Sequence, residues 1–176
     1  MKRTTAVIAI SAALFVGLAL GSAIAKNKAD ASVFKGKPAK VAGRALLDLA
    51  ASNAGSGSWE NIDVARVYYR AGFKKEAEAI LDKVRAGRLK DNDWIRIGRL
   101  YQQVGDWAKA KAAFDKVIQM SPDDQDWMAE IGAYYNLHGD RAEAEKLFTR
   151  SFKRDSESFR NMLKAGGSYF GVPPEN

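Results

Sequence analysis

The chain has 176 residues, and its hydrophobic content of 47% is enough for one folded domain with its own core. It contains no cysteine, which excludes disulfides, thiolate chemistry and a lipid anchor on cysteine. The formal charge of +7 favours acidic partners or anionic surfaces, although only weakly.

The N-terminus has the pattern of a secretory signal peptide. Lys2 and Arg3 form a short basic region, and residues 6–25 carry no charge. Ala23-Ile24-Ala25 is an A-x-A cleavage site, and Ala29-Asp30-Ala31 is a second option. We therefore expect residues 1–25 to be removed and the protein to be periplasmic or secreted, with a remaining charge of about +5.

The same segment leaves a second interpretation open. Twenty uncharged residues can also span a bilayer, and lysines follow the segment as well as precede it. In this alternative, residues 6–25 stay in place and anchor the protein to a membrane.

A basic stretch, residues 26–40, follows without periodicity, and we expect a flexible lead there. Residues 41–54 have the apolar content of a helix, with Leu46, Leu47 and Leu49. Gly55-Ser56-Gly57-Ser58 then predicts a helix stop or a short linker.

Residues 91–120 predict two helices joined by a tight turn. Trp94, Ile97, Gly98 and Tyr101 lie at i, i+3, i+4 and i+7 and form one apolar stripe. Gly105 ends this helix, and Asp106 can cap the next one. The second helix has Ala110 and Phe114 on one face and ends at Ser121-Pro122.

This helix pair recurs along the chain with a period of about 34 residues. The recurrence is strong downstream, in Met128, Ile131, Gly132, Tyr135, Gly139, Ala144 and Phe148. It is weaker upstream, in Val64, Ala65, Tyr68, Gly72, Ala77, Leu81 and Val84. Near the C-terminus only a first helix recurs, with Met162, Ala165, Gly166 and Tyr169. A glycine inside a helix costs about 1 kcal/mol against alanine. Its recurrence at 98 and 132 therefore predicts a close approach of the partner helix.

The spacing divides the chain into three helical hairpins, at 58–90, 91–124 and 125–157, and a capping helix at 158–171. These residues resemble the tetratricopeptide repeat, W-x2-L-G-x2-Y…A-x3-F…P, over roughly residues 58–172. The middle unit matches except for Ile97 in place of leucine, while the third has Met128 in place of tryptophan and lacks the closing proline. The resemblance implies an all-α, right-handed α-solenoid, a fold that usually binds partners rather than catalysing reactions.

In tetratricopeptide domains the first helices line a concave peptide groove. The resemblance places these residues there: Arg66, Tyr69, Arg70, Arg96, Arg99, Gln102, Gln103 and Asn136. Arginine forks suit carboxylates, so we expect a protein or peptide partner, with acidic segments favoured. The alternative is a plain solvated face in which charges such as Asp63 and Arg96 simply pair. A carboxylate clamp is not expected, because Asp126 and Glu130 stand where cations would be needed.

Other chemistry has little support in the sequence. His138 is the only histidine and lies in a turn, so neither a metal site nor a cofactor is expected. The acidic residues after Pro122 suit helix capping better than acid-base catalysis. We interpret Trp59, Trp94 and Trp127 as packing anchors, and Trp107 as exposed on the convex side. Nucleic-acid binding is not expected.

Together these patterns predict a non-enzymatic protein–protein interaction scaffold of the cell envelope. One alternative is a membrane-anchored assembly factor with the same repeats. A second is an enzyme whose site lies outside the recognised residues. The sequence leaves open the partner, the pathway and the oligomeric state.

Overall fold

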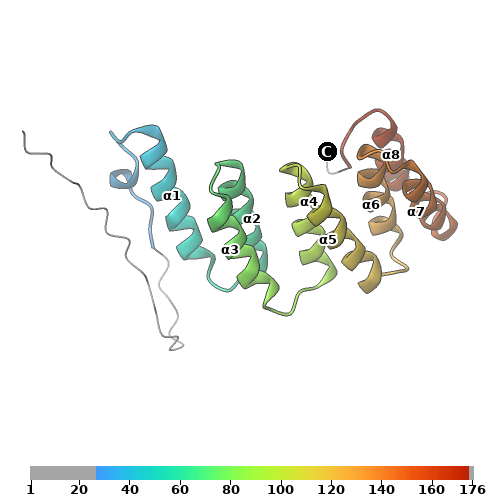
Figure 1. Cartoon of the computed structure of the whole chain (residues 1–176), viewed down its shortest axis with the longest axis horizontal. Coiled ribbons are helices and arrows are strands. Elements are labelled where there is room, and N and C mark those ends of the chain that lie inside the picture. The colour runs from blue at the N-terminus through green and yellow to red at the C-terminus, as the bar shows by residue number, and fades with distance from the viewer. Residues whose placement is uncertain (1–26, 175–176) are drawn as a thin grey trace, which may run out of the picture.

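The computed structural model describes residues 27–174, so the predicted signal peptide and its first cleavage site lie outside the described residues. The described chain forms a row of helices without strands (Figure 1). In chain order the elements are η1 (Ala31–Val33), α1 (Ala39–Ala54), α2 (Ser58–Arg70), α3 (Lys74–Arg85), α4 (Asp91–Gln103), α5 (Trp107–Met120), α6 (Gln125–Leu137), α7 (Arg141–Arg154) and α8 (Phe159–Tyr169). The predicted all-α stack of helical hairpins is confirmed. Within residues 27–174, no helix is both long and apolar enough to cross a membrane.

Each hairpin turns at one glycine. Gly72, Gly105 and Gly139 follow α2, α4 and α6, and their φ angles of 91°, 79° and 92° lie in the left-handed region that side chains with a Cβ disfavour. The next helix then begins at an acidic cap in two of the three turns. Asp106 accepts from the Lys109 N–H and Asp140 from the Glu143 N–H, both at 3.2 Å.

The recurring helical glycines allow the close packing that the sequence predicted. A Cβ at Gly98 would lie 2.3 Å from Phe114 Cε1, and one at Gly132 would lie 2.8 Å from Phe148 Cε1. Phe114 and Phe148 are buried, so their rings cannot easily move away. In the second and third units, the glycine of the first helix therefore packs directly against the phenylalanine of the second helix.

Part of the predicted flexible lead is structured. The Asn27 N–H donates to Asn53 Oδ1, and Asn53 Nδ2 donates to the Asn27 carbonyl, both at 2.8 Å. Asp30 caps the short helix η1, and α1 begins at Ala39 rather than at residue 41. Residues 27–38, predicted as part of a flexible lead, therefore hold one short helix and two hydrogen bonds from Asn27 to α1, which hydrophobic periodicity does not register.

The C-terminal helix α8 packs against α6, as expected of a cap, but its outer face is apolar. Phe159 is 71% exposed and Phe170 88%, and Met162 and Leu163 are also exposed between them. A cap is expected to present a polar outer face, so α8 covers the preceding hairpin without closing the stack.

Candidate functional site

The first predicted groove arginines lie on α2. Arg66 Nη1 donates to Asp63 Oδ1 of the same helix at 2.8 Å. Its Nε is buried and has no hydrogen-bond partner among the described residues. Arg70 is exposed at the last turn of α2. Because the Nε–H of Arg66 is buried, an incoming partner could reach this side chain only through its terminal N–H groups.

Arg96 of α4 lies over the indole of Trp59 on α2, with its guanidinium carbon 3.9 Å from the ring centroid. Trp59 is 48% exposed, so the interpretation of this residue as a packing anchor is wrong. Trp94 and Trp127 do pack against the core. A register signal separates them: Trp94 lies three residues before Ile97, whereas Trp59 lies five before the equivalent Val64. That offset turns Trp59 away from the core stripe.

Arg99 has a structural role that the groove prediction missed. Its Nη2 lies 2.6 Å from Glu130 Oε1, and its Nε donates to the same oxygen at 2.7 Å. Glu130 is only 3% exposed, and Lys164 Nζ lies 3.5 Å from its other oxygen. Arg99, Glu130 and Lys164 therefore join α4, α6 and α8, and Arg99 is committed to this network rather than available to a partner.

One repeat position alternates in charge along the stack. Asp63, Arg96, Glu130 and Lys164 occupy equivalent places in successive first helices and carry negative, positive, negative and positive charges. No ion pair joins Asp63 to Arg96 in the described part of the chain, since Asp63 pairs with Arg66 and Arg96 stacks on Trp59. The plain pairing considered for these two residues is therefore wrong.

Two other predicted groove residues hold helices together. The Tyr69 hydroxyl donates to Glu78 Oε1 at 2.9 Å, and its ring meets Tyr101 edge-on with centroids 6.1 Å apart. Asn136 Nδ2 donates to Ser168 Oγ of α8 at 3.0 Å. These contacts tie the Tyr69 hydroxyl to α3 and one N–H of the Asn136 amide to α8. Gln103 is exposed at the end of α4.

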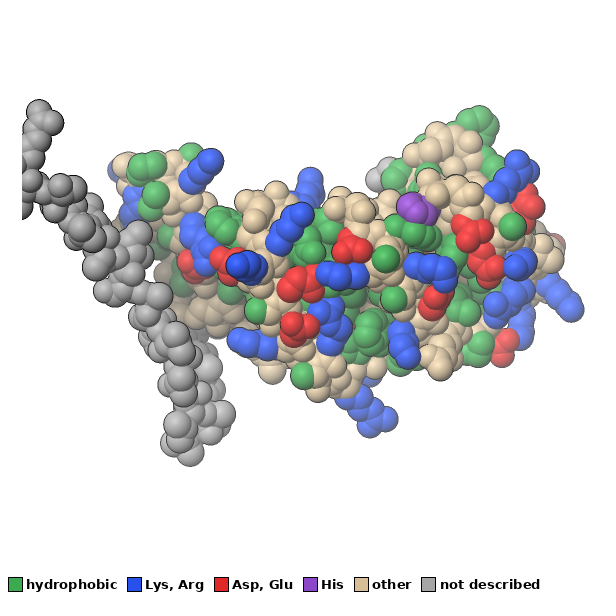
Figure 2. Space-filling view, viewed as in Figure 1, with side chains coloured by type: hydrophobic (Ala, Val, Ile, Leu, Met, Phe, Trp, Pro, Cys, Tyr) green, Lys and Arg blue, Asp and Glu red, His purple; other side chains and the backbone are tan. Residues whose placement is uncertain are grey.

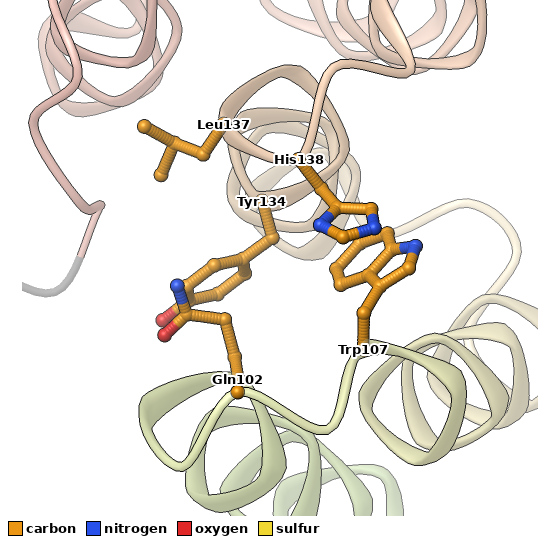
Figure 3. A pocket seen from close by; sticks show the side chains of 6 residues that line it. Gln102, Trp107, Tyr134, Leu137 and His138 are labelled. Atoms are coloured by element: carbon orange, nitrogen blue, oxygen red, sulfur yellow. The ribbon is translucent and has the colours of Figure 1, made fainter.

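Gln102 lines a small cavity between α4 and α6, of about 90 Å³, with Trp107, Tyr134, Leu137 and His138. The His138 imidazole stacks on the Trp107 indole with centroids 4.2 Å apart (Figure 3). Trp107 also meets the Tyr135 ring edge-on at 5.3 Å. The interpretation of Trp107 as an exposed convex residue is wrong, because it packs between α5 and α6. The cavity has room for a few waters but not for a peptide side chain of any size.

Glu78 of α3 accepts from four donors, three on the neighbouring helices α2, α4 and α5 and one, Arg85, on α3 itself. Tyr69, Tyr101, Lys109 and Arg85 all bond its carboxylate, at 2.6–3.2 Å. Burial alone would raise the pKa of Glu78, but these hydrogen bonds outweigh it and lower the pKa to about 2. Burial raises the pKa of Tyr101 to about 12, so the phenol remains a donor. This cluster links the first and second units.

The acidic residues after Pro122 are engaged in structure. Asp124 caps α6 by accepting from the N–H groups of Asp126 and Trp127, at 2.9 and 3.0 Å. Asp123 pairs with Arg154 of α7. Among residues 27–174, no group of three or more metal-ligating side chains comes together. Lys and Arg side chains alternate with Asp and Glu on the face shown in Figure 2, rather than forming one charged patch.

The hairpin stack defines the chain as a helical-repeat protein of the α-solenoid class. The family model described as tetratricopeptide repeat matches residues 92–124, which hold α4 and α5. No curated protein matches the chain. A helical hairpin of the same kind lies on either side of the matched unit, so the match to the tetratricopeptide repeat covers the middle one of three similar hairpins. Repeats of this family generally mediate protein–protein interaction and typically act as non-enzymatic scaffolds.

Proposed function

We propose that this protein is a non-enzymatic interaction scaffold of the cell envelope that binds an acidic, extended segment of a partner protein. The binding surface consists of Trp59, Arg66, Arg70 and Arg96, and is called here the Trp59 surface. The observation that carries the proposal is the Arg96 guanidinium stacked 3.9 Å over a half-exposed Trp59. Tryptophan and arginine are the residues most enriched among binding hot spots.

The chemistry of the Trp59 surface suits a carboxylate-bearing chain. Stacking on the indole fixes the plane of the Arg96 guanidinium and leaves its edge N–H groups to form paired bonds with a carboxylate. Arg66 and Arg70 add two further cations on α2, of which Arg70 is exposed. Asp63 neutralises part of this charge, so the surface favours a segment in which acidic and apolar residues are mixed.

A titration with labelled poly-glutamate as a surrogate acidic chain tests this surface. We expect Trp59→Ala with Arg96→Glu to weaken binding about a hundredfold, because each lost charged hydrogen bond is worth about 1.5–3 kcal/mol. Lys116→Glu on α5 makes the same charge change on another helix and should have little effect. Binding should also weaken with salt, since charges are screened beyond about 8–10 Å near physiological ionic strength. If Lys116→Glu weakened binding as much as the double variant, net charge alone would explain the effect, and the assignment of binding to the Trp59 surface would be wrong.

Export of the protein is part of the proposal, and it is supported by residues 1–25. Cleavage after Ala25 retains Asn27 and its paired hydrogen bonds with Asn53, whereas cleavage after Ala31 would remove them. We therefore expect protein from the native host to begin at Lys26 when its N-terminus is sequenced. Intact Met1 in a membrane pellet would support the alternative of a membrane-anchored assembly factor.

A further inference from the structure

Helix α1 repeats the sequence of the second helices of the stack. Residues 43–50 (GRALLDLA) lie 34 positions before residues 77–84 of α3 (AEAILDKV) and also align with residues 110–117 of α5 (AKAAFDKV). Leu47 thereby takes the place of Leu81 and Phe114. Asp48 accepts from the Tyr68 hydroxyl as Asp115 accepts from Tyr135, in both cases 20 positions apart. Helix α1 is a second helix whose own first helix is missing among the described residues.

Helix α8 is the opposite half of a unit. Its Met162, Ala165, Gly166 and Tyr169 repeat the first-helix residues Met128, Ile131, Gly132 and Tyr135. In the second and third units the glycine contacts a phenylalanine of the second helix, but nothing lies within 4 Å of a Cβ built at Gly166. The segment after α8 turns back on Gly167 instead, where Val172 contacts it. The space that a second helix would fill on α8 is therefore open.

Both open faces are apolar. On α8 the exposed residues include Phe159, Met162 and Leu163, at the spacing of one helix face. On α1 the exposed residues include Val41 and Leu46. Leu46 is equivalent to Leu147 of α7, which is buried. A Cβ built at Gly132 of α6 would lie 3.2 Å from the Cβ of Leu147. A Cβ built at Gly43 would have no atom within 4 Å, although the other second helices carry a buried alanine at this position.

We propose that α1 of a second copy packs on α8 and completes a hairpin between the two chains. The joint would continue an interface that the chain already contains three times, between α2 and α3, α4 and α5, and α6 and α7. It would place Leu47 of the second copy beside Gly166, as Phe148 lies beside Gly132. Helices α1 and α8 lie at opposite ends of the long axis of the molecule (Figure 1). The contact is thus head-to-tail, and it produces open chains of molecules rather than a closed two-fold dimer.

Two single substitutions block the two halves of this joint separately. Gly166→Glu places a charged side chain in the open space on α8, and Leu46→Glu places one on the open face of α1. Both sites are exposed in the single chain, and glutamate favours a helix over glycine, so neither change should unfold the protein. Ala79→Glu on the exposed side of α3 is the matched control.

Sedimentation equilibrium of the chain that begins at Lys26, over a concentration series, measures the outcome. The wild type and Ala79→Glu should rise above the mass of one chain, and each blocked variant alone should stay at that mass. An equimolar mixture of the two blocked variants should form dimers and nothing larger, because one retains an open α1 and the other an open α8. The proposal would be overturned by a monomeric wild type, or by association that neither substitution reduces. It would also be overturned if Gly166→Glu alone lost association and the mixture did not recover it, a result that would indicate α8-to-α8 pairing.

Discussion

The Tyr135 hydroxyl donates to Asp115 at 2.6 Å and ties α6 to α5, the second helix of the preceding unit. Lys111 lies over the same ring at 5.4 Å and also pairs with Asp115 at 2.8 Å. Burial raises the pKa of Tyr135 to about 12, so the phenol remains protonated and available as a donor. Tyr68 and Asp48 repeat the arrangement between α2 and α1. The repeat tyrosine therefore joins successive units, while the repeat glycine joins the two helices within one.

Removing this hydroxyl should weaken the joint between units. We expect Tyr135→Phe to lower the free energy of unfolding by about 1.5–3 kcal/mol, the range for a hydrogen bond to a charged group. Urea unfolding measures the change. Asp115→Ala tests the assignment through a double-mutant cycle: if the two residues act through this bond, the second substitution adds less than its separate effect. Fully additive losses would show that the hydroxyl acts elsewhere.

The three equivalent glycines should respond differently to a methyl group. Gly98→Ala and Gly132→Ala introduce a Cβ 2.3 and 2.8 Å from a buried phenylalanine and should cost about 1–3 kcal/mol by overpacking. Gly166→Ala has open space and should stabilise the helix by up to about 1 kcal/mol. Melting temperatures of the three variants provide the comparison. Similar shifts at all three positions would contradict the close approach within the complete units.

The Glu78 cluster should make stability depend on pH. Its pKa is about 2 in the folded protein against 4.5 ordinarily, so the carboxylate contributes its full stability above about pH 4.5 and loses it as the pH falls toward 2. The contribution is on the order of 2–3 kcal/mol. The free energy of unfolding, measured with urea, should therefore fall more steeply between about pH 6 and pH 2 for the wild type than for Glu78→Gln. Parallel curves would mean that the four donors do not favour the charged form.

We expect Arg99 to contribute mainly to stability and Arg96 mainly to binding. Arg99→Ala leaves the buried Glu130 with only the longer contact to Lys164, and should cost up to about 3–5 kcal/mol of stability. Arg96→Ala removes an exposed stacking contact worth about 0.5–1 kcal/mol and should mainly reduce binding of an acidic chain. Thermal unfolding measures the first effect and peptide titration the second. A reversal of the two effects would contradict the separation of roles.

The packing residues could be predicted from the sequence because each unit repeats them. Gly98 and Phe114 recur as Gly132 and Phe148, so one hairpin explains the next. The polar residues could not be assigned in this way, because their contacts depend on the neighbouring unit. Arg66 and Arg99 hold equivalent positions, yet Arg99 finds Glu130 on the next first helix, whereas the equivalent residue beyond Arg66 is Arg96.

Two further features depended on register rather than residue type. Trp59 is an aromatic residue near a helix start, as Trp94 is, but it lies two positions out of register and is exposed. Helix α1 was expected as a helix but not as a member of the repeat, because Gly43 and Leu47 replace the more characteristic alanine and phenylalanine. Its membership becomes clear only when Asp48 is seen to bond Tyr68.

Site-specific photo-crosslinking in the native host tests the binding surface most directly. A photoreactive phenylalanine derivative replaces Arg70, an exposed residue of the Trp59 surface, or Lys116, which is exposed on α5. We predict a discrete covalent adduct with a partner protein from position 70, and its loss when Trp59→Ala and Arg96→Glu are added. An adduct from position 116 that survives those substitutions, with none from position 70, would place the partner on the second helices and contradict the account.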